Sequence, residues 1–291
     1  MEGFTIPAGA ALLLQGGGLR GNYTSGVLDV LMEQGLYFPT VAGVSAGALN
    51  AMNYLARQPG RSARINLSYR HDPRYCGPLA VLQSKGVFGV SFLVDQLSRR
   101  EHFDQKTFDE SKEDLFVVAT DIDTGKAAFF RKGHCKDFDR AIVASASIPV
   151  VSLPVKIGGH RYLDGGCACP VPLAWAIGRG NHPIVVVATR EKGYRKPLIG
   201  QRQVDLYSDF YSRNPEFLST LLTMDLQYNN LMDRLEAMED AGEIFVLRPR
   251  EPITIGQFET DTDKLLALVN RGRRDAQEDL PRLLEFLERN R

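Results

Sequence analysis

Ser45 lies at the centre of a Gly-x-Ser-x-Gly pentapeptide bounded by Gly43 and Gly47, and its hydroxyl is a candidate nucleophile. The residues before it, 37–42, read as a short buried strand, and residues 48–56 read as a helix. A serine on such a strand–turn–helix elbow is exposed, and the helix N-terminus points at its surroundings. Because the pentapeptide is also common by chance, its chemistry depends on what the rest of the chain supplies.

A serine hydroxyl is a poor nucleophile at neutral pH and needs a base within hydrogen-bond reach. Asp164 is the first candidate, since it ends a predicted hairpin strand and precedes Gly165 and Gly166, which permit a sharp turn. His182 is the second, and the order serine, aspartate, histidine matches that of α/β-hydrolases. His182 directly precedes a buried strand, however, so in a parallel sheet it lies at the edge opposite Ser45. We therefore predict a Ser45–Asp164 dyad without a histidine.

Three consecutive glycines, Gly16, Gly17 and Gly18, follow an apolar run over residues 10–15. Consecutive glycines let backbone N–H groups converge on one anionic point, with the dipole of the following helix behind them. Donors arranged in this way stabilise the oxyanion that develops during acyl transfer. The loop also holds Arg20, whose side chain could bind a phosphate or brace the turn.

The same loop allows a different function, because residues 16–21 match the Gly-x-Gly-x-x-Gly pattern of dinucleotide sites after a strand. The acidic residue that such sites carry about twenty positions further on is missing, since residues 39–41 are Pro-Thr-Val. A nucleotide- or phosphate-binding protein is therefore one alternative. A catalytically silent scaffold that binds lipid or protein partners is another, although the presence of Ser45 and Asp164 argues against it.

Two other groupings suggest metal sites, but we predict no metal at either. Asp121 and Asp123 stand in a turn, and no third ligand is spaced for a metal, so we expect a turn role. Cys167 and Cys169 have no partner Cys or His at zinc spacing, so we expect small packing residues. The remaining histidines stand in polar or turn contexts and are expected on the surface: His71, His102, His134 and His160.

Composition excludes some classes of partner. The 35 basic and 35 acidic residues balance, so no global basic excess argues for nucleic acid or an anionic surface. We expect the basic clusters within residues 61–74 and 192–202 to be solvated loop charges. Four cysteines lack the density of a disulfide framework, and no apolar run reaches the roughly 18 residues of a membrane span. We expect a cytoplasmic protein, with peripheral contact at a membrane left open.

Apolar runs alternate with helical stripes, which predicts an α/β fold with a mostly parallel sheet. We expect strands over residues 10–15, 37–42, 115–120, 184–188 and 244–247, hairpins over 115–130 and 155–163, and helices over 27–36, 48–56, 79–84, 90–99, 137–146, 172–177, 217–238 and 265–287. The opening strand–loop–helix–strand order puts the glycine loop and Ser45 at the same edge of the sheet.

Five stretches occur together and in order: the glycine loop, the serine elbow, residues 120–125, residues 144–149 and Asp164-Gly165-Gly166. With this ordered set the chain resembles the patatin-like phospholipase family over about residues 10–190. The resemblance implies a three-layer α/β/α fold and hydrolysis of acyl esters of lipids or phospholipids, without a metal or cofactor. The site that it implies is a Ser45–Asp164 dyad with an oxyanion hole from the loop that holds Gly16, Gly17, Gly18 and Arg20.

Two positions depart from the pattern of the family. Gln15 stands where an acidic residue often precedes the glycine triplet, and Cys169-Pro170 stand where asparagines often follow the Asp-Gly-Gly motif. Both bear on how the Asp164 loop is braced, and neither touches the dyad. We assign residues 8–190 to a catalytic region and residues 191–291 to a C-terminal helical region that completes or packs on the same domain.

Overall fold

The computed structural model describes residues 4–73, 75 and 101–291. The strands are β1 (Ala11–Leu14), β2 (Thr40–Val44), β3 (Asp114–Asp121), β4 (Ala127–Arg131), β5 (Val155–Ile157), β6 (His160–Asp164), β7 (Ile184–Val187) and β8 (Ile244–Leu247). The helices are α1 (Gly21–Glu33), α2 (Ala46–Leu55), α3 (Arg61–Ser68), α7 (Gln105–Glu110), α8 (Phe138–Ser145), α9 (Leu173–Gly178), α10 (Gln201–Tyr211), α11 (Pro215–Asp240) and α12 (Thr262–Arg289), with short 3-10 turns η1 (Gly18–Arg20) and η3 (Gly165–Cys167).

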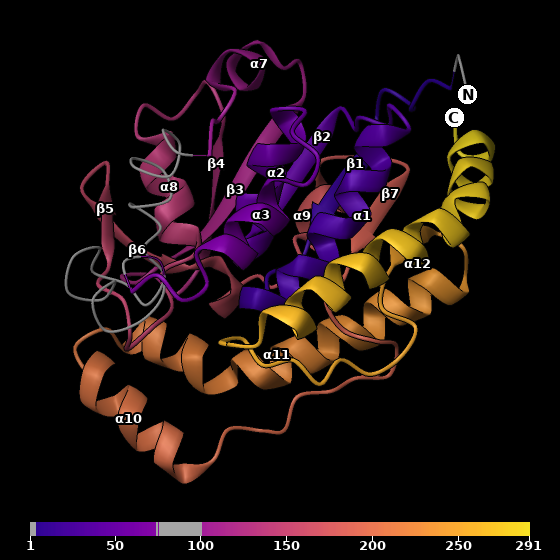
Figure 1. The fold of residues 1–291 in the computed structure, drawn as a ribbon. Helices are drawn as coiled ribbons and strands as arrows, with labels where there is room; N and C mark the ends of the chain where they lie inside the picture. Colours follow the sequence, from indigo (N-terminus) through magenta and orange to yellow (C-terminus); the bar gives the residue numbers. More distant parts are fainter. Residues whose placement is uncertain (1–3, 74, 76–100) are drawn as a thin grey trace.

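One twisted sheet forms the centre of the molecule (Figure 1). Its strands run in the order β5-β6-β3-β2-β1-β7-β8, and β4 also pairs with β3. The ladders that join β3, β2, β1, β7 and β8 are parallel, whereas β4 and β6 pair antiparallel with β3 and β5 pairs antiparallel with β6. This confirms the predicted α/β class with a mostly parallel sheet.

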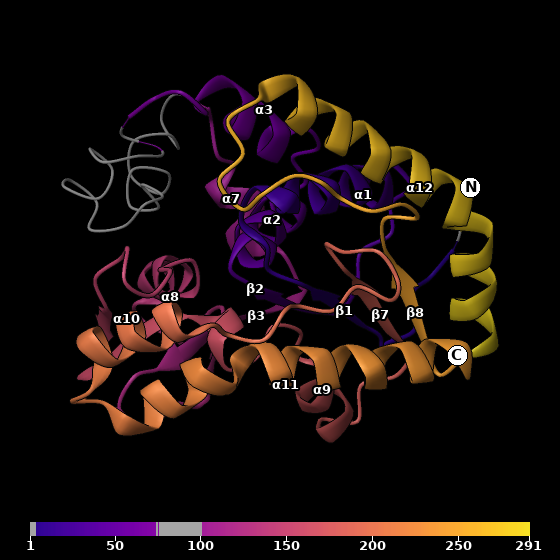
Figure 2. The same ribbon diagram turned by 90° about the horizontal axis from the view of Figure 1, so that it is seen from below.

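Helices cover both faces of the sheet. Side chains alternate between the two faces along each strand, so an apolar strand presents apolar side chains on both faces, and both must be buried. In β1, Leu12 and Leu14 belong to the core under α1, α2 and α12, while Ala11 and Leu13 belong to the core under α9 and α11. Figure 2 shows the three layers edge-on, with α1, α2 and α12 on one side of the sheet and α9 and α11 on the other. The apolar runs of the parallel strands therefore reflect burial on both faces.

The last helix, α12, packs against α1 through two glycines. A Cβ at Gly26 would lie 2.1 Å from the Val269 carbonyl oxygen, and a Cβ at Gly272 would lie 2.1 Å from the Tyr23 carbonyl oxygen. The missing side chains thus let the two backbones touch. Around this contact Arg273 forms ion pairs with Asp29 and Glu33 of α1, and β8 adds the C-terminal region to the same sheet beside β7.

Some predicted boundaries were wrong. The strand expected over residues 37–42 is β2 at Thr40–Val44, because the Phe38 N–H donates to the Tyr54 hydroxyl instead of joining the ladder. Helix α1 begins at Gly21, earlier than expected, and ends at Glu33 before Gly35 in the left-handed region. Helices α3, α7 and α10 were not predicted: α3 and α7 are short, and α10 buries only Tyr207 and Tyr211. The helices expected over residues 79–84 and 90–99 lie outside the described residues.

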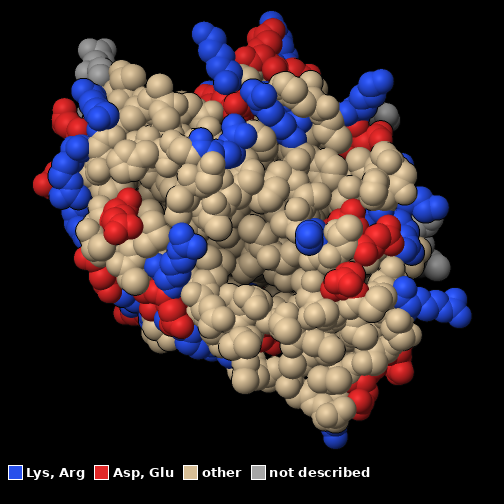
Figure 3. Space-filling model, turned by 180° about the vertical axis from the view of Figure 1, so that it is seen from behind, with Lys and Arg blue, Asp and Glu red and all other residues tan. Residues whose placement is uncertain are grey.

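The basic clusters are not simply solvated loop charges. Arg61 and Arg70 are buried and donate to the carbonyl oxygens of Glu101 and Glu259. In the second cluster, Lys192, Arg195 and Lys196 each form an ion pair with a carboxylate of α11. The face in Figure 3 shows basic and acidic side chains interspersed around a broad, hollowed area of other residues. Across the described residues, no helix is both long and apolar enough to cross a bilayer.

Candidate active site

Ser45 forms the turn between β2 and α2, and its own backbone carries the strain of that turn. Its φ is 54° with ψ −122°, a region that residues other than glycine rarely adopt. The flanking glycines are needed for close approach instead. A Cβ at Gly43 would lie 2.7 Å from backbone atoms of Ala48, and one at Gly47 would lie 2.3 Å from the Leu14 carbonyl oxygen.

The structure brings Ser45 and Asp164 together. The Ser45 Oγ donates to the Asp164 Oδ2 at 2.7 Å, although 119 positions separate the two residues in the chain. The other carboxylate oxygen, Oδ1, accepts from the Gly166 N–H at 2.7 Å. Gly165 leaves room for the turn, since its Cβ would lie 2.2 Å from the Val118 carbonyl oxygen. The serine hydroxyl thus already lies against a carboxylate that is held in place from its other side.

Burial changes the acidity of this carboxyl group. Asp164 is 8% exposed, and loss of hydration raises its pKa to about 6 even though the hydrogen bonds from Ser45 and Gly166 act to lower it. A carboxyl group with that pKa is largely ionised at neutral pH and is still basic enough to take a proton in a transition state. Geometry and acidity are therefore both suited to a general base.

Three residues that the sequence analysis did not propose as site residues hold the two side chains in place. The Ser45 N–H donates to the Ser145 Oγ at 2.8 Å, and the Asp164 N–H donates to the Ser147 carbonyl oxygen at 2.8 Å. The Thr120 hydroxyl donates to the Asp164 carbonyl oxygen at 2.8 Å. All three belong to stretches that carried the family resemblance. The sequence therefore marked these stretches, but it did not indicate which hydrogen bonds their residues form.

The glycine loop runs directly beside Ser45. A Cβ at Gly16 would lie 3.0 Å from the Ser45 Cβ, and Gly18 has a φ of 57°. The Leu19 N–H donates to the Gln257 carbonyl oxygen, and the Arg20 N–H donates to the Gly17 carbonyl oxygen. Within residues 4–73, 75 and 101–291, by contrast, no acceptor takes the N–H of Gly16 or Gly17. Two backbone donors therefore remain available next to Ser45.

The side chain of Gln15, the first departure from the family pattern, forms hydrogen bonds to Thr189 and Tyr228. Its Oε1 accepts from both the Thr189 N–H, at 2.7 Å, and the Thr189 hydroxyl, at 3.1 Å. Its Nε2 donates to the Tyr228 hydroxyl at 3.4 Å. A carboxylate could accept from Thr189 but could not donate to Tyr228, so the amide links the end of β7 to α11.

His182 lies away from Ser45 and Asp164. It precedes β7, which runs parallel to β1, and its N–H donates to the Gly9 carbonyl oxygen at the start of β1. The carboxyl ends of these strands, where Ser45 and the glycine loop lie, are at the opposite edge of the sheet. This agrees with the sequence argument that left histidine out of the site.

Two cavities meet at Ser45. The smaller, of about 90 Å³, has a mostly apolar lining that includes Leu19, Leu49, Met52, Ile65, Phe103 and Ile148. The larger, of about 300 Å³, is polar, and its lining includes Arg20, Asp164, Arg190, Lys196, Tyr194 and Tyr228. Ser45 therefore lies between a mostly apolar cavity and a polar cavity.

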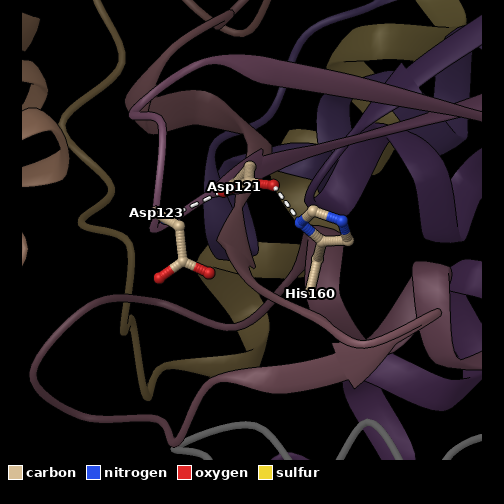
Figure 4. Close-up of side chains that lie close together, drawn as sticks. All are labelled: Asp121, Asp123 and His160. Atoms are coloured by element: carbon tan, nitrogen blue, oxygen red, sulfur yellow. Dashed lines mark hydrogen bonds and ion pairs between the residues drawn. The ribbon is translucent and has the colours of Figure 1, made fainter.

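The statement that no third ligand is spaced near Asp121 and Asp123 was wrong. Because β6 pairs antiparallel with β3, His160 joins them, and one ligand atom from each residue lies within 4.8 Å of the others (Figure 4). The contacts nevertheless agree with the turn role. Asp121 accepts from the Asp123 and Thr124 N–H groups, its carboxylate lies 3.3 Å from the His160 Nδ1, and Asp123 is paired with Arg161. The grouping carries no metal assignment.

Cys167 and Cys169 follow the Asp164 turn. Cys167 is buried and Cys169 half-buried, both are free, and burial raises the pKa of the Cys169 thiol to about 12. No cysteine joins a metal-type grouping among the described residues. The Cys169 N–H donates to the Gly165 carbonyl oxygen, so the second departure from the family pattern sits at the end of the Asp164 turn.

Comparison with known proteins identifies similar chains. The chain is 26% identical over 254 residues to "Uncharacterized protein YjjU" of Escherichia coli. This alignment covers 85% of this chain and 70% of the relative. It is 25% identical to "Probable lipid hydrolase 463L" of Invertebrate iridescent virus 6, over 75% of this chain and 84% of the relative. It is 26% identical to a "cGAMP-activated phospholipase" of Pseudomonas aeruginosa, over 57% of this chain and 55% of that protein.

Structural and family comparisons add three findings. The solved structure of VipD from Legionella pneumophila aligns with 97% of this chain and 67% of that chain, at a TM-score of 0.46 and 12% identity. A domain of unknown function, DUF6363, matches residues 214–288. The model described as patatin-like phospholipase matches residues 12–176, which is more than half of the 291 residues. The chain therefore belongs to the patatin-like phospholipase family.

Proposed function

We propose that this chain is a serine hydrolase that cleaves carboxylic esters of lipids, with Ser45 as nucleophile and Asp164 as its base. The observation that carries the proposal is the 2.7 Å hydrogen bond from the Ser45 hydroxyl to a buried carboxylate. Relatives named phospholipase and probable lipid hydrolase support the substrate class.

In the proposed reaction, the Ser45 Oγ attacks the ester carbonyl carbon as Asp164 takes its proton. The N–H groups of Gly16 and Gly17, which have no acceptor among the described residues, donate to the resulting oxyanion together with the rest of the loop through Gly18. Asp164 then passes the proton to the departing alcohol. In the second half, Asp164 takes a proton from water as the water oxygen attacks the acyl carbonyl carbon. Asp164 then passes this proton to the departing Ser45 Oγ, which releases the fatty acid and restores the serine hydroxyl.

The apolar cavity beside Ser45 suits the acyl chain, since Leu49, Met52 and Phe103 line it. No step of the proposed reaction uses a metal or a cofactor. We also propose that residues 8–190 and 191–291 act as one unit, because Tyr228 lines the polar cavity and Gln257 holds the glycine loop.

Labelling with a fluorophosphonate probe tests the proposal. Wild type is expected to react covalently, Ser45→Ala is expected to lose all labelling, and His182→Ala is expected to label at the wild-type rate. Loss of labelling in a folded His182→Ala protein would indicate a conventional triad. A wild-type protein that neither labels nor hydrolyses any lipid ester would instead support a silent scaffold or a phosphate-binding role.

The pH dependence of hydrolysis is expected to follow Asp164. Because burial raises the pKa of this carboxyl group to about 6, the proton that blocks base catalysis is bound below that pH. We expect kcat/KM for a short-chain ester to fall roughly tenfold per pH unit below about pH 6 and to level off above about pH 7. Initial rates between about pH 4.5 and 9, with folding monitored by circular dichroism, check this. A flat profile across that range would rule out Asp164 as the base.

A further inference from the structure

Two arginines of the polar cavity have unused donors. Arg20, from η1, and Arg190, which follows β7, both line the cavity next to Ser45 and Asp164. The Nε of each is buried and has no hydrogen-bond partner among the described residues. Burial, and then the charge of Arg190, lower the pKa of Arg20 to about 10, so the two guanidinium groups are close enough to repel each other. With that pKa, Arg20 is charged at neutral pH.

The acidic groups nearby are already engaged. Asp225 forms an ion pair with Lys196 at 3.1 Å, and Asp164 accepts from Ser45 and Gly166. Glu191 accepts from the Ile253 N–H, while the Arg190 Nη1 donates to the Ile253 carbonyl oxygen at 2.5 Å. Among the described residues, neither Arg20 nor Arg190 forms an ion pair with a carboxylate.

Other side chains complete an anion site. The Arg190 guanidinium stacks on the Tyr194 ring, 4.2 Å from its centroid, which fixes the plane of its donors. The Tyr228 hydroxyl accepts from Gln15, so its own proton remains free to donate. Two like charges in a partly buried cavity are stabilised by an anion between them, and phosphate matches the fork of a guanidinium.

We propose that the polar cavity binds the phosphate of an acyl-ester substrate, with Arg190 and Arg20 as its ligands. The proposal rests on the proposed function, because the cavity adjoins the same Ser45. A phosphate monoester carries about −1.5 to −2 charge at pH 7. Two guanidinium groups match that charge better than the single charge of a phosphodiester. The preferred substrate class is therefore an acylated glycerol with a terminal phosphate, ahead of choline-type or uncharged head groups.

Kinetics with three matched substrates test this inference: a monoacylglycerol phosphate, a lysophosphatidylcholine and a monoacylglycerol with the same acyl chain. Wild type is expected to prefer the phosphate monoester. Arg190→Met is expected to reduce kcat/KM for the monoester relative to the monoacylglycerol by about 10- to 100-fold, the effect of losing a hydrogen bond to a charged group. Arg190→Lys, which keeps the charge without the fork, should lose less.

Arg202→Met is the matched control, because Arg202 is exposed on α10 and does not line the cavity. Its monoester-to-monoacylglycerol ratio is expected to equal that of wild type. A second readout is inhibition of fluorophosphonate labelling by glycerol 3-phosphate, which should weaken in Arg190→Met by the same factor as the ratio. This binding readout does not depend on turnover.

The two proposals fail in different ways. If no ester is hydrolysed and no probe labels Ser45, the proposed function is wrong. If Ser45-dependent hydrolysis is present but Arg190→Met leaves the substrate ratio unchanged, the phosphate site is wrong. A wild-type preference for the lysophosphatidylcholine over the monoester would overturn the assignment of a terminal phosphate.

Discussion

Asp164→Asn is expected to lower kcat/KM for lipid esters by about 10³-fold or more near pH 8, where the wild-type carboxyl group is ionised. Asparagine has nearly the same shape, and its amide oxygen can still accept from the Gly166 N–H. Its amide nitrogen, however, donates to the Ser45 Oγ and cannot take the proton of that hydroxyl. Initial rates at saturating and limiting ester concentrations measure the loss.

The same Asp164→Asn substitution should raise the stability of the protein although it lowers its activity. The folded pKa of Asp164, about 6, lies above the pKa of 3.8 of a solvated aspartate side chain, so the folded protein binds the extra proton and loses stability as pH rises between these values. Above pH 6 the buried charge costs on the order of 1–3 kcal/mol, which the neutral asparagine avoids. Asp164→Asn is thus expected to lose most of its activity and yet to require more urea to unfold at pH 8.

Asp209→Asn, on the exposed side of α10, makes the same chemical change without touching the site and should alter neither quantity. An Asp164→Asn protein that loses activity and stability together would indicate a structural carboxylate. Retained activity would exclude Asp164 as the base whatever the stability.

Gly47→Ala is expected to destabilise the protein by about 2–4 kcal/mol, within the upper range for overpacked cores. The added Cβ would lie 2.3 Å from the Leu14 carbonyl oxygen and 3.0 Å from that of Gln15. Both contacts are with backbone, which cannot rotate away as a flexible side chain would. The strain falls on the end of β1, directly before the glycine loop, so hydrolysis should fall with stability.

Gly178→Ala provides the control for this substitution, because no heavy atom lies within 4 Å of its Cβ position and its φ is not positive. Urea unfolding of both variants should shift the midpoint for Gly47→Ala and leave Gly178→Ala near wild type. Equal stability of the two variants would mean that α2 approaches β1 less closely than described.

The sequence predicted the elements that carry local patterns. The apolar run before the glycines became β1, and the position of His182 before a parallel strand correctly separated it from Ser45. The hairpin that ends at Asp164 was readable from its turn glycines. These features depend on neighbours in the chain, which is why periodicity and turn chemistry were sufficient.

The remaining features depend on contacts between distant segments. The pairing of β6 with β3 places Tyr162 opposite Asp121, and only this register brings His160 beside the Asp121 turn. Arg190 follows a strand and lies just before the basic cluster at residues 192–202, yet the structure places it in a cavity with Arg20. The role of Ser145 is equally hidden, since 100 positions separate its hydroxyl from the Ser45 N–H.

The contact between α1 and α12 has a consequence for synthesis. Arg273 of α12 bonds to Glu33 of α1 across 240 positions of the chain. At roughly 5–20 residues per second, a ribosome completes that interval in about 12–48 s. During this time the Gly26 face of α1 is exposed and Leu19 lacks its Gln257 partner. The nascent chain therefore carries Ser45 and Asp164 before the Gln257 contact to its glycine loop can form, and we expect it to aggregate more readily than the complete chain.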